Sequence, residues 1–259
     1  MYSFKDKVLM VAGGGRGIGG QVARDFVAAG GKVAIGDINS SLGRQLAFEL
    51  GPDGSMFFPL DVTVEESCKD FVAETQKAFG RLDCLVNSAI SINAGTLLDM
   101  SVADWKKTID IGLTGSFVMA RSFVAALLET ERPGAIVNMS SVAAFNPYSG
   151  TGSYSTVKAS ILHLSDLMAI EWSRYGIRVN AIAPGTVETP LTAYLQDPEI
   201  RRVRSETIPL GRVGQPADVS GAVLYLLSDA AAWVTASTLV IDGGVNASLM
   251  NHIPGRSWN

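Results

Sequence analysis

The sequence VLMVAGGGRGIG, residues 8–19, decides the fold class. Its first half is a short apolar run typical of a buried parallel strand, and its second half is a glycine cluster that leads into a helical pattern from Gly17. Glycines at such a junction let backbone amides approach a pyrophosphate, and the helix N-terminus adds favourable positive potential. The spacing of Gly13, Gly17 and Gly19 departs from the commonest dinucleotide fingerprint. By itself, the stretch therefore leaves open a strand–helix turn without a ligand.

Short apolar runs and longer helical patterns alternate along the rest of the chain, and the apolar runs are typical of strands buried on both faces. We predict strands at Val8–Ala12, Lys32–Gly36, Met56–Leu60, Leu82–Asn87, Ala135–Met139, Arg178–Ala183 and Thr238–Ile241. We predict helices at Gly17–Ala29, Ser41–Leu50, Val64–Phe79, Val102–Thr130, Ser153–Tyr175 and Pro216–Ser228. The fourth of these is long and is expected to hold two helices, broken near Gly112 and Gly115.

This alternation predicts an α/β fold: a single Rossmann-type, doubly wound domain over residues 1–259, with about seven parallel strands and helices on both faces. No linker, repeat or low-complexity segment interrupts it. Residues 186–212 form an insertion punctuated by Pro190, Pro198 and Pro209. We expect this insertion to lie over the carboxyl ends of the strands as a substrate lid. Residues 246–259 form a C-terminal tail, either docked on a neighbouring subunit or frayed.

The composition argues against several classes of function. The net charge of −4 and the pI near 5.2 provide no basic surface for nucleic acid or acidic lipid. The N-terminal residues lack the apolar segment of a signal peptide, and no uninterrupted apolar run reaches the roughly 20 residues of a transmembrane helix. We therefore expect a cytoplasmic protein with no membrane partner, no nucleic-acid partner and no metal site. Cys68 and Cys84 are expected to be reduced.

Asp37 bears on the choice of cofactor. It closes the second predicted strand, near the offset of about 20 residues expected for an acid that bonds the adenosine ribose hydroxyls. A carboxylate there would repel the 2′-phosphate of NADP, although Arg16 in the glycine loop could reach that phosphate. We predict NAD, with NADP less favoured. Asp37 could instead only begin the turn before the next helix, and Asp61, after the third strand, could bond adenine or only begin a turn.

Tyr154 and Lys158 are four residues apart near the start of a predicted helix, which puts both side chains on one face. A phenol with a reference pKa of about 10 is a poor proton-transfer group at neutral pH. An adjacent ammonium favours the phenolate, so we expect Lys158 to lower the pKa of Tyr154. Ser141 ends the fifth predicted strand, where its hydroxyl could bond a substrate oxygen. A Tyr and a Lys at this spacing are also common on solvated helix faces, but the serine and the glycine loop favour a site.

Together these motifs resemble the short-chain dehydrogenase/reductase (SDR) family, and the resemblance runs over nearly the whole chain. It implies Ser141, Tyr154 and Lys158 as catalytic residues, with Lys158 also binding the nicotinamide ribose. Asn180 and the stretch Asp242-Gly243-Gly244 match further family signatures. The resemblance implies cofactor contacts from the glycine loop and from the segments after other strands: Gly13, Gly15, Arg16, Gly17, Ile18, Gly19, Asp37, Ile38, Asp61, Val62, Asn87, Ser88, Ala89, Tyr154, Lys158, Pro184, Gly185, Val187 and Thr189.

Four positions depart from the family pattern. Ala12 replaces a threonine, Ile90 replaces a glycine in the turn Asn87-Ser88-Ala89-Ile90, and Ala236 replaces a glycine near the C-terminus. Gly112 stands where the family carries a fourth catalytic residue, an asparagine thought to hold a water that connects the lysine to solvent. We expect either that an extra water fills the volume of the missing side chain or that this proton relay is weakened.

The resemblance implies an oxidoreductase that interconverts a secondary alcohol and a ketone, with Tyr154 as general acid/base and the cofactor carrying hydride. Two alternatives stay open. One is a nicotinamide-binding protein with little or no turnover, which only Gly112 favours; the other is an epimerase or dehydratase on the same scaffold. Phe145, Tyr148 and Tyr194 are expected to line the substrate pocket and to favour an apolar small-molecule alcohol or ketone. Since the family is usually homotetrameric, a homotetramer is also expected.

Overall fold

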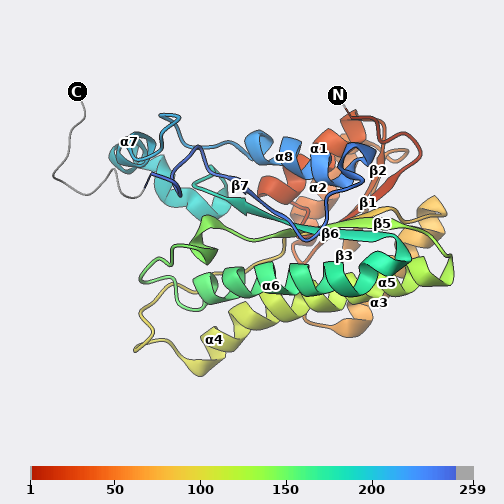
Figure 1. Cartoon of the computed structure of the whole chain (residues 1–259), viewed down its shortest axis with the longest axis horizontal. Helices are drawn as coiled ribbons and strands as arrows, with labels where there is room; N and C mark the ends of the chain where they lie inside the picture. Colours follow the sequence, from red (N-terminus) through yellow and green to blue (C-terminus); the bar gives the residue numbers. More distant parts are fainter. Residues whose placement is uncertain (1, 249–259) are drawn as a thin grey trace.

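The computed structural model describes residues 2–248 and shows one sheet of seven parallel strands between helices (Figure 1). The strands are β1 Val8–Ala12, β2 Lys32–Asp37, β3 Ser55–Pro59, β4 Cys84–Asn87, β5 Gly134–Met139, β6 Ile177–Pro184 and β7 Thr238–Ile241. Their order in the sheet is β3-β2-β1-β4-β5-β6-β7. The α-helices are α1 Gly17–Ala28, α2 Ser40–Leu50, α3 Glu65–Phe79, α4 Val102–Ile109, α5 Gly115–Glu129, α6 Tyr154–Trp172, α7 Pro198–Glu206 and α8 Pro216–Leu227. The predicted doubly wound α/β fold is confirmed.

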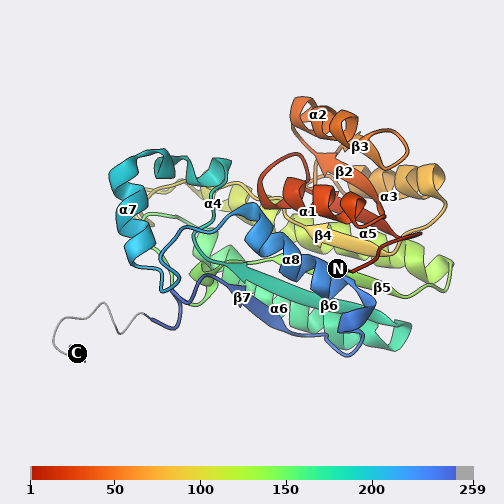
Figure 2. The ribbon, with the colours of Figure 1, turned by 90° about the horizontal axis from the view of Figure 1, so that it is seen from above.

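Helices cover both faces of the sheet. α1, α2 and α8 lie on one face, whereas α3, α5 and α6 lie on the other (Figures 1 and 2). Consecutive residues of β1 point alternately into two hydrophobic cores: Leu9 and Val11 pack on the first side, and Met10 and Ala12 pack on the second. Because all four side chains are buried, the strand must be apolar at every position, which explains its uninterrupted apolar sequence.

Most predicted elements agree with the structure to within two residues at each end. The exceptions lie in two long helices. The last predicted turn of α6 is a separate 3₁₀ turn, Ser173–Tyr175, after which Gly176 adopts a left-handed conformation with φ of 73°. Glycine is the residue that adopts this conformation without steric cost, so the helix ends there.

The region 102–130 holds two α-helices divided near Gly112 and Gly115, as predicted, but the division is a π-helical turn and not a break. α4 continues through a single π-helical turn, Asp110–Thr114, into α5, and the backbone stays in the helical region at both junctions. Gly115 serves close packing here, because a Cβ at this position would lie 2.7 Å from Val62 Cγ2. By length and composition Val102–Glu129 would also suit a membrane span, although buried residues of α5 pack in the core against the sheet.

The two cysteines lie in different cores. Cys68 packs with the core beside α3 and α5, and Cys84 packs with the core beside α1 and α8. Both are free thiols, as predicted. Burial raises the pKa of Cys68 to about 11 and that of Cys84 to about 12, so both stay protonated at neutral pH.

The sheet order sets the position of the site. β1 lies between β2 and β4, so the connections after β1 and β4 leave in opposite directions and open a crevice at the carboxyl ends of the strands. A backbone hydrogen bond of 2.8 Å from Ser88 N to Ala12 O joins these two strand ends. The insertion 186–212 contains the 3₁₀ segment Pro190–Gln196 and α7, and it lies beyond the same ends (Figure 2). Residues 246–248 are the described part of the predicted tail, whereas residues 249–259 lie outside the described residues.

Candidate active site

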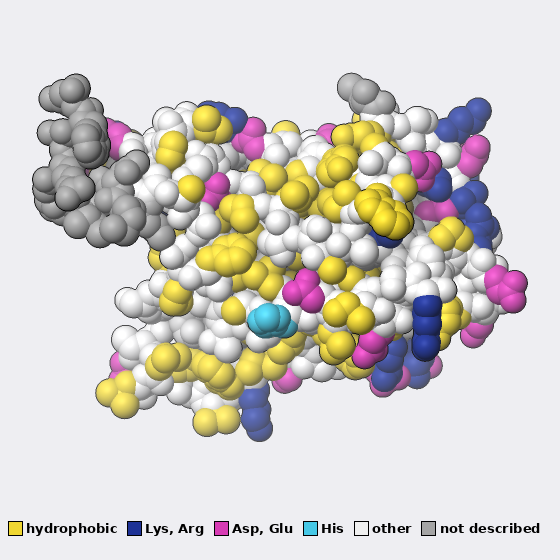
Figure 3. Space-filling model, viewed as in Figure 1, with side chains coloured by type: hydrophobic (Ala, Val, Ile, Leu, Met, Phe, Trp, Pro, Cys, Tyr) yellow, Lys and Arg dark blue, Asp and Glu magenta, His cyan; other side chains and the backbone are white. Residues whose placement is uncertain are grey.

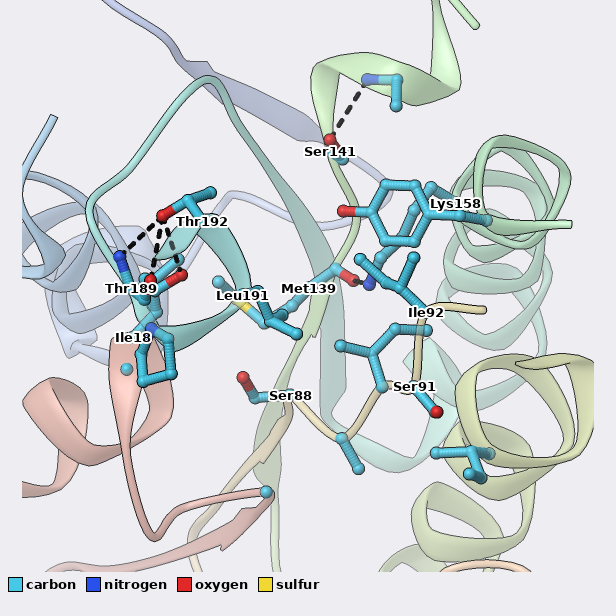
Figure 4. Close-up of a pocket in the computed structure, with 18 of the residues that line it drawn as sticks. Ile18, Ser88, Ser91, Ile92, Met139, Ser141, Lys158, Thr189, Leu191 and Thr192 are labelled. Carbon is cyan, nitrogen blue, oxygen red and sulfur yellow. Dashed lines mark hydrogen bonds between the residues drawn. The ribbon is translucent and has the colours of Figure 1, made fainter. Parts of the chain in front are cut away.

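One cavity of about 1210 Å³ opens at the carboxyl ends of the strands. Its lining comes from several separate segments: the glycine loop, the segments after β2, β3, β4, β5 and β6, the start of α6 and the insertion. Figure 4 shows residues from these separate segments facing a common space. Most of the predicted site residues line it: Gly13, Arg16, Gly17, Ile18, Asp37, Ile38, Asp61, Val62, Ser88, Ala89, Ser141, Tyr148, Tyr154, Lys158, Pro184, Gly185, Val187, Thr189 and Tyr194.

The glycine loop is shaped to accept an anion. Gly13 and Gly17 have φ values of 81° and 59°, a region that residues with a side chain rarely adopt. A Cβ on Gly13 would also lie 2.6 Å from the backbone nitrogen of Ala89. α1 starts at Gly17 with no side-chain cap from Arg16 and with no acidic residue in its first turn. Its first amides therefore retain donor capacity toward the cavity, which fits the pyrophosphate of a dinucleotide.

Asp37 lines the cavity and also holds the glycine loop in place. Its Oδ2 accepts a hydrogen bond of 2.8 Å from Gly15 N, and its Oδ1 accepts one of 2.9 Å from Asn39 N. Each carboxylate oxygen keeps further acceptor capacity, so the side chain can still bond ribose hydroxyls. Asp61 accepts hydrogen bonds from the backbone and the hydroxyl of Thr63, so it begins a turn as well as lining the cavity.

Tyr154 and Lys158 lie together at the start of α6. Lys158 is buried, and its Nζ donates a hydrogen bond of 2.6 Å to Met139 O at the end of β5 (Figure 4). The same Nζ lies 5.6 Å from the ring centroid of Tyr154. Burial lowers the pKa of Lys158 to about 8. Burial also raises the pKa of Tyr154, and a hydrogen bond from Ser141 partly opposes that rise. Without cofactor or substrate, the pKa of Tyr154 is therefore raised by burial and not lowered by Lys158 as we expected.

Ser141 is oriented by the backbone that follows it. Its Oγ accepts a hydrogen bond of 3.1 Å from Ala143 N, in the short 3₁₀ turn Val142–Ala144. Because that amide occupies an acceptor position, the hydroxyl proton is free to point into the cavity. Ser141 can therefore donate to an oxygen held beside Tyr154.

Four predicted residues do not line the cavity. Gly15 donates to Asp37, and Gly19 stands against Gly13 O, where a Cβ would overlap. Asn87 is buried and donates to Ser116 O and to Asn138 Oδ1, at 3.2 and 2.9 Å, so it links β4 to α5 and β5. These three residues act on the cavity through the backbone that they position. Phe145 lies outside the lining with 43% of its surface exposed, so it is not part of the substrate region proposed below.

The surroundings of Gly112 correct one prediction. A Cβ at Gly112 would lie 2.6 Å from Ile90 Cδ1 and 2.7 Å from Val157 Cγ1. The Gly112 carbonyl accepts a hydrogen bond of 2.7 Å from Ser116 Oγ. Apolar side chains therefore fill the volume beside Gly112, and the prediction that water fills it is wrong. Ile90 and Gly112 are both departures from the family pattern, and the isoleucine occupies the volume that the glycine leaves.

Several lining residues were not predicted from the sequence. Ile92 follows β4, and Leu191, Thr192 and Arg204 belong to the insertion. The Thr192 hydroxyl donates to Val187 O at 2.7 Å and accepts from Thr189 N at 2.9 Å, so it holds the start of the insertion in shape (Figure 4). The sequence predicted that the insertion lies over the strand ends. No spacing rule, however, indicates which of its side chains face the cavity.

Comparison with known proteins places this geometry in a family. A family model described as Enoyl-(Acyl carrier protein) reductase matches residues 12–246. The 2,5-dichloro-2,5-cyclohexadiene-1,4-diol dehydrogenase LinX of Sphingobium indicum is 34% identical over 240 residues, which cover 92% of this chain and 95% of LinX. A 3-alpha-(or 20-beta)-hydroxysteroid dehydrogenase of Mycobacterium tuberculosis is 36% identical over 246 residues, with 95% and 92% coverage.

The fold comparison agrees with the sequence comparison. The solved structure of a short-chain type dehydrogenase/reductase from Mycobacterium ulcerans superposes with a TM-score of 0.89 at 32% identity, covering 95% of this chain and 91% of that one. The matched family model covers most of the chain, and both curated relatives are dehydrogenases matched over nearly their whole lengths. The chain therefore belongs to the short-chain dehydrogenase/reductase family, whose dehydrogenases are oxidoreductases that use nicotinamide cofactors.

Proposed function

We propose that the protein is an NAD(H)-dependent oxidoreductase that interconverts a secondary alcohol and a ketone. The observation that carries the proposal is the meeting of Ser141, Tyr154 and Lys158 in one cavity with an uncapped helix N-terminus. The three side chains can transfer a proton to or from the oxygen of a secondary alcohol. The helix N-terminus can bind the pyrophosphate of the cofactor. Two relatives, named for a hydroxysteroid and a cyclohexadiene diol, support the same class of reaction.

The proposed mechanism assigns one task to each of three side chains. When bound, the nicotinamide ring supplies or accepts the hydride. Tyr154 Oη gives a proton to the ketone oxygen during reduction and takes it back during oxidation. Ser141 donates a hydrogen bond to the same oxygen and so fixes its position. The buried Lys158 ammonium, 5.6 Å from the Tyr154 ring centroid, stabilises the phenolate that remains after proton donation.

The raised pKa of Tyr154 bears on the direction of the reaction. In the cofactor-free site burial favours the neutral phenol, which is the proton donor that ketone reduction needs. Oxidation needs the phenolate and therefore depends on positive charge near the ring. Lys158 is the cation that this chain provides there, and its own pKa of about 8 leaves it mostly protonated at neutral pH.

Asp37 supports NAD over NADP in this proposal. Its carboxylate lines the cavity at the end of β2, where an adenosine ribose would lie. A 2′-phosphate there would meet this negative charge. Arg16 is exposed and lines the same region, so it is the side chain that would favour NADP instead.

The proposed assembly is a homotetramer in the cytoplasm. Exposed apolar side chains lie on α6, where Leu167 and Ile170 are 52% and 71% exposed, and beside β7, where Trp233 is fully exposed. Figure 3 shows hydrophobic side chains gathered on the face that α6 covers. Apolar patches of this kind favour contact with another copy. α6 is one of the two long helices, and β7 is the last strand, through which the family usually associates.

The test is a spectrophotometric assay at the reduced-nicotinamide absorbance band, with NAD and NADP and a panel of cyclic and linear secondary alcohols. We expect turnover with NAD that exceeds turnover with NADP. Tyr154→Phe is the matched control that removes the proton-transfer group alone. Tight NAD binding by calorimetry without turnover on any alcohol or ketone would reject the proposal in favour of a non-catalytic nicotinamide-binding protein. Substrate conversion without net change in absorbance would favour an epimerase or dehydratase.

A further inference from the structure

Arg204 occupies an unusual place at the edge of the cavity. It belongs to α7 in the insertion, and its guanidinium carbon lies 5.8 Å from the ring centroid of Tyr148 and 5.7 Å from that of Tyr194. All three residues line the cavity. The two aromatic faces hold the cation in position without using its hydrogen-bond donors.

The other arginines of α7 are already paired with carboxylates. Arg201 NH2 lies 2.8 Å from Glu188 Oε2, and Arg202 lies 2.6 Å from both Glu199 and Glu206. Within residues 2–248, by contrast, Arg204 has no ion pair and its guanidinium makes no hydrogen bond to a protein group. The segment 249–259 contains no Asp or Glu. Among the described residues, the guanidinium donors of Arg204 therefore have no protein acceptor.

The described lining of the cavity carries three acidic and five basic side chains. The acidic lining residues are Asp37, Asp61 and Asp110, and the basic residues Arg16, Lys106 and Lys107 also come from the first half of the chain. From residue 139 onward the described lining contains Lys158 and Arg204 and no acidic residue. Lys158 is buried and donates to Met139 O. Arg204 is therefore the cation that the second half of the chain adds to the lining besides the buried, engaged Lys158.

Arg204 and its two aromatic neighbours line the same cavity as Tyr154. The guanidinium thus contacts two rings of the cavity that also holds Tyr154. A planar guanidinium binds a carboxylate through two parallel hydrogen bonds, which fixes orientation as well as adding affinity.

We propose that Arg204 binds a carboxylate of the substrate, so that the substrate is a secondary alcohol or ketone with an apolar body and a carboxylate at its far end. Ile92 and Leu191 line the space for the apolar body. This inference deepens the proposed function and rests on it for the identity of the reacting group. The competing role for Arg204 is a purely structural one, a cation that holds Tyr148 and Tyr194 together.

A binding experiment tests the carboxylate site without requiring turnover. Cyclohexanecarboxylate and cyclohexanecarboxamide are titrated by calorimetry into NAD-saturated protein, because they differ in charge but little in shape. We expect the wild type to bind the carboxylate at least about tenfold more tightly, Arg204→Met to lose that preference and Arg204→Lys to retain part of it. Arg202→Met, on the same helix but paired outside the cavity, is the control expected to keep it. Equal affinity for the two probes, no binding of the carboxylate, or a preference that survives Arg204→Met would overturn the inference.

A kinetic experiment separates this inference from the proposed function. 4-Hydroxycyclohexanecarboxylate and its methyl ester carry the same secondary alcohol, so only the remote charge differs. We expect Arg204→Met to raise KM for the acid by about tenfold or more and to change KM for the ester much less. Absence of turnover on both compounds, with the calorimetric preference retained, would reject the proposed reaction and keep the carboxylate site. Equal kcat/KM for acid and ester in the wild type would reject the carboxylate site and keep the reaction.

Discussion

The two ends of the cavity are built by different means. At the nucleotide end, the backbone determines the shape of the cavity. Gly13 and Gly17 take positive φ angles, and Asp37 accepts a hydrogen bond from the amide of Gly15. At the substrate end, the geometry belongs to side chains on helices and on the insertion. Tyr148 and Tyr194 there are 43% and 45% exposed. The first end is fixed by strand positions, whereas the second can change residue by residue without changing the fold.

This difference explains how one scaffold can keep a cofactor and change its substrate. Backbone amides and positive φ angles at the nucleotide end tolerate few residues other than glycine, because a Cβ would meet the backbone directly. The substrate end depends on exposed aromatic rings and on one arginine of α7. Substitutions should therefore separate the two ends, and the following four experiments test that separation.

Tyr154→Phe should have the largest effect. It should abolish turnover at the substrate end and leave cofactor binding at the nucleotide end intact. The substitution removes the proton-transfer hydroxyl and keeps the ring, so we expect kcat to fall by about 10³-fold or more. NAD affinity should stay nearly unchanged, because the glycine loop and Asp37 are untouched. Steady-state kinetics and calorimetric titration with NAD measure the two effects. Substantial residual turnover would refute the proton-transfer role, and a large loss of NAD affinity would show that the two ends are not separable.

Lys158 joins the two ends and gives a pH-dependent prediction for stability. Its pKa falls from 10.5 in the unfolded chain to about 8 in the folded protein, because burial disfavours its charge. Between these values the unfolded state binds more protons, so rising pH removes a cost of burial and stabilises the folded protein. From pH 8 to 10.5 the wild type should gain about 3 kcal/mol relative to Lys158→Met, which carries no such charge.

Urea unfolding of both proteins across this pH range measures the gain, in the absence of cofactor. Lys107→Met is the matched control, since Lys107 is an exposed lysine at the rim of the same cavity. Its stability relative to wild type should stay nearly constant over the range. If the difference between wild type and Lys158→Met were also constant, the buried ammonium would not carry the cost that we assign to it.

Gly112→Asn tests whether the side chains of Ile90 and Val157 fill the space beside Gly112. A Cβ at position 112 would lie 2.6 Å from Ile90 Cδ1 and 2.7 Å from Val157 Cγ1, so the asparagine must displace packed atoms. Overpacking of this kind costs about 2 kcal/mol, which we expect as the loss in the free energy of unfolding. Chemical denaturation measures the loss.

Ile90→Ala provides the second arm of this experiment. It removes the Cδ1 atom that the asparagine would meet, so Gly112→Asn should cost roughly 1 kcal/mol less in the Ile90→Ala background than in the wild type. Additive losses would contradict the exchange of volume between positions 90 and 112. They would leave the isoleucine and the glycine as two unrelated departures from the family pattern.

The sequence predicted the sheet well for a physical reason. Strands such as β1 are buried on both faces, so every position must be apolar, and the strand–helix junctions carry glycines. The helix Val102–Glu129 was harder to predict, because a glycine in a helix can mark either a break or a close contact. Gly112 and Gly115 both mark close contacts with side chains from other segments, and no local pattern shows that.

The residues of the site that could be predicted are those whose positions follow from the regular geometry of a strand or a helix. Gly13, Gly17 and Asp37 follow a strand at fixed offsets, and Tyr154 and Lys158 follow helical spacing, so each could be named from the sequence. Arg204 could not, because Tyr148 lies far from it along the chain and no regular spacing relates it to Tyr194. The same reason hid the partnership of Ile90 with Gly112. Long-range contacts between side chains determine the substrate end, and a single sequence does not display them.

Ala236→Gly should have the smallest effect. It tests whether the backbone conformation before β7 is one that favours glycine. Ala236 precedes β7, donates a hydrogen bond of 2.9 Å to Val179 O and has a φ of 51°. A left-handed conformation costs a residue with a Cβ roughly 1–2 kcal/mol, and glycine avoids this cost but loses more entropy on folding. We expect a net gain of about 0.5 kcal/mol in the free energy of unfolding, measured as a slightly higher midpoint in urea.

Ala232→Gly separates the conformational effect from the general effect of adding a glycine. Ala232 is also exposed and lies only four residues away, but its φ is −57°, where alanine is not strained. Glycine should therefore destabilise at position 232 and stabilise at position 236, and the opposite signs are the signature of a backbone requirement. Equal destabilisation at both positions would mean that the left-handed turn before β7 stores no strain. The conformation at that strand end would then be one that alanine adopts without cost.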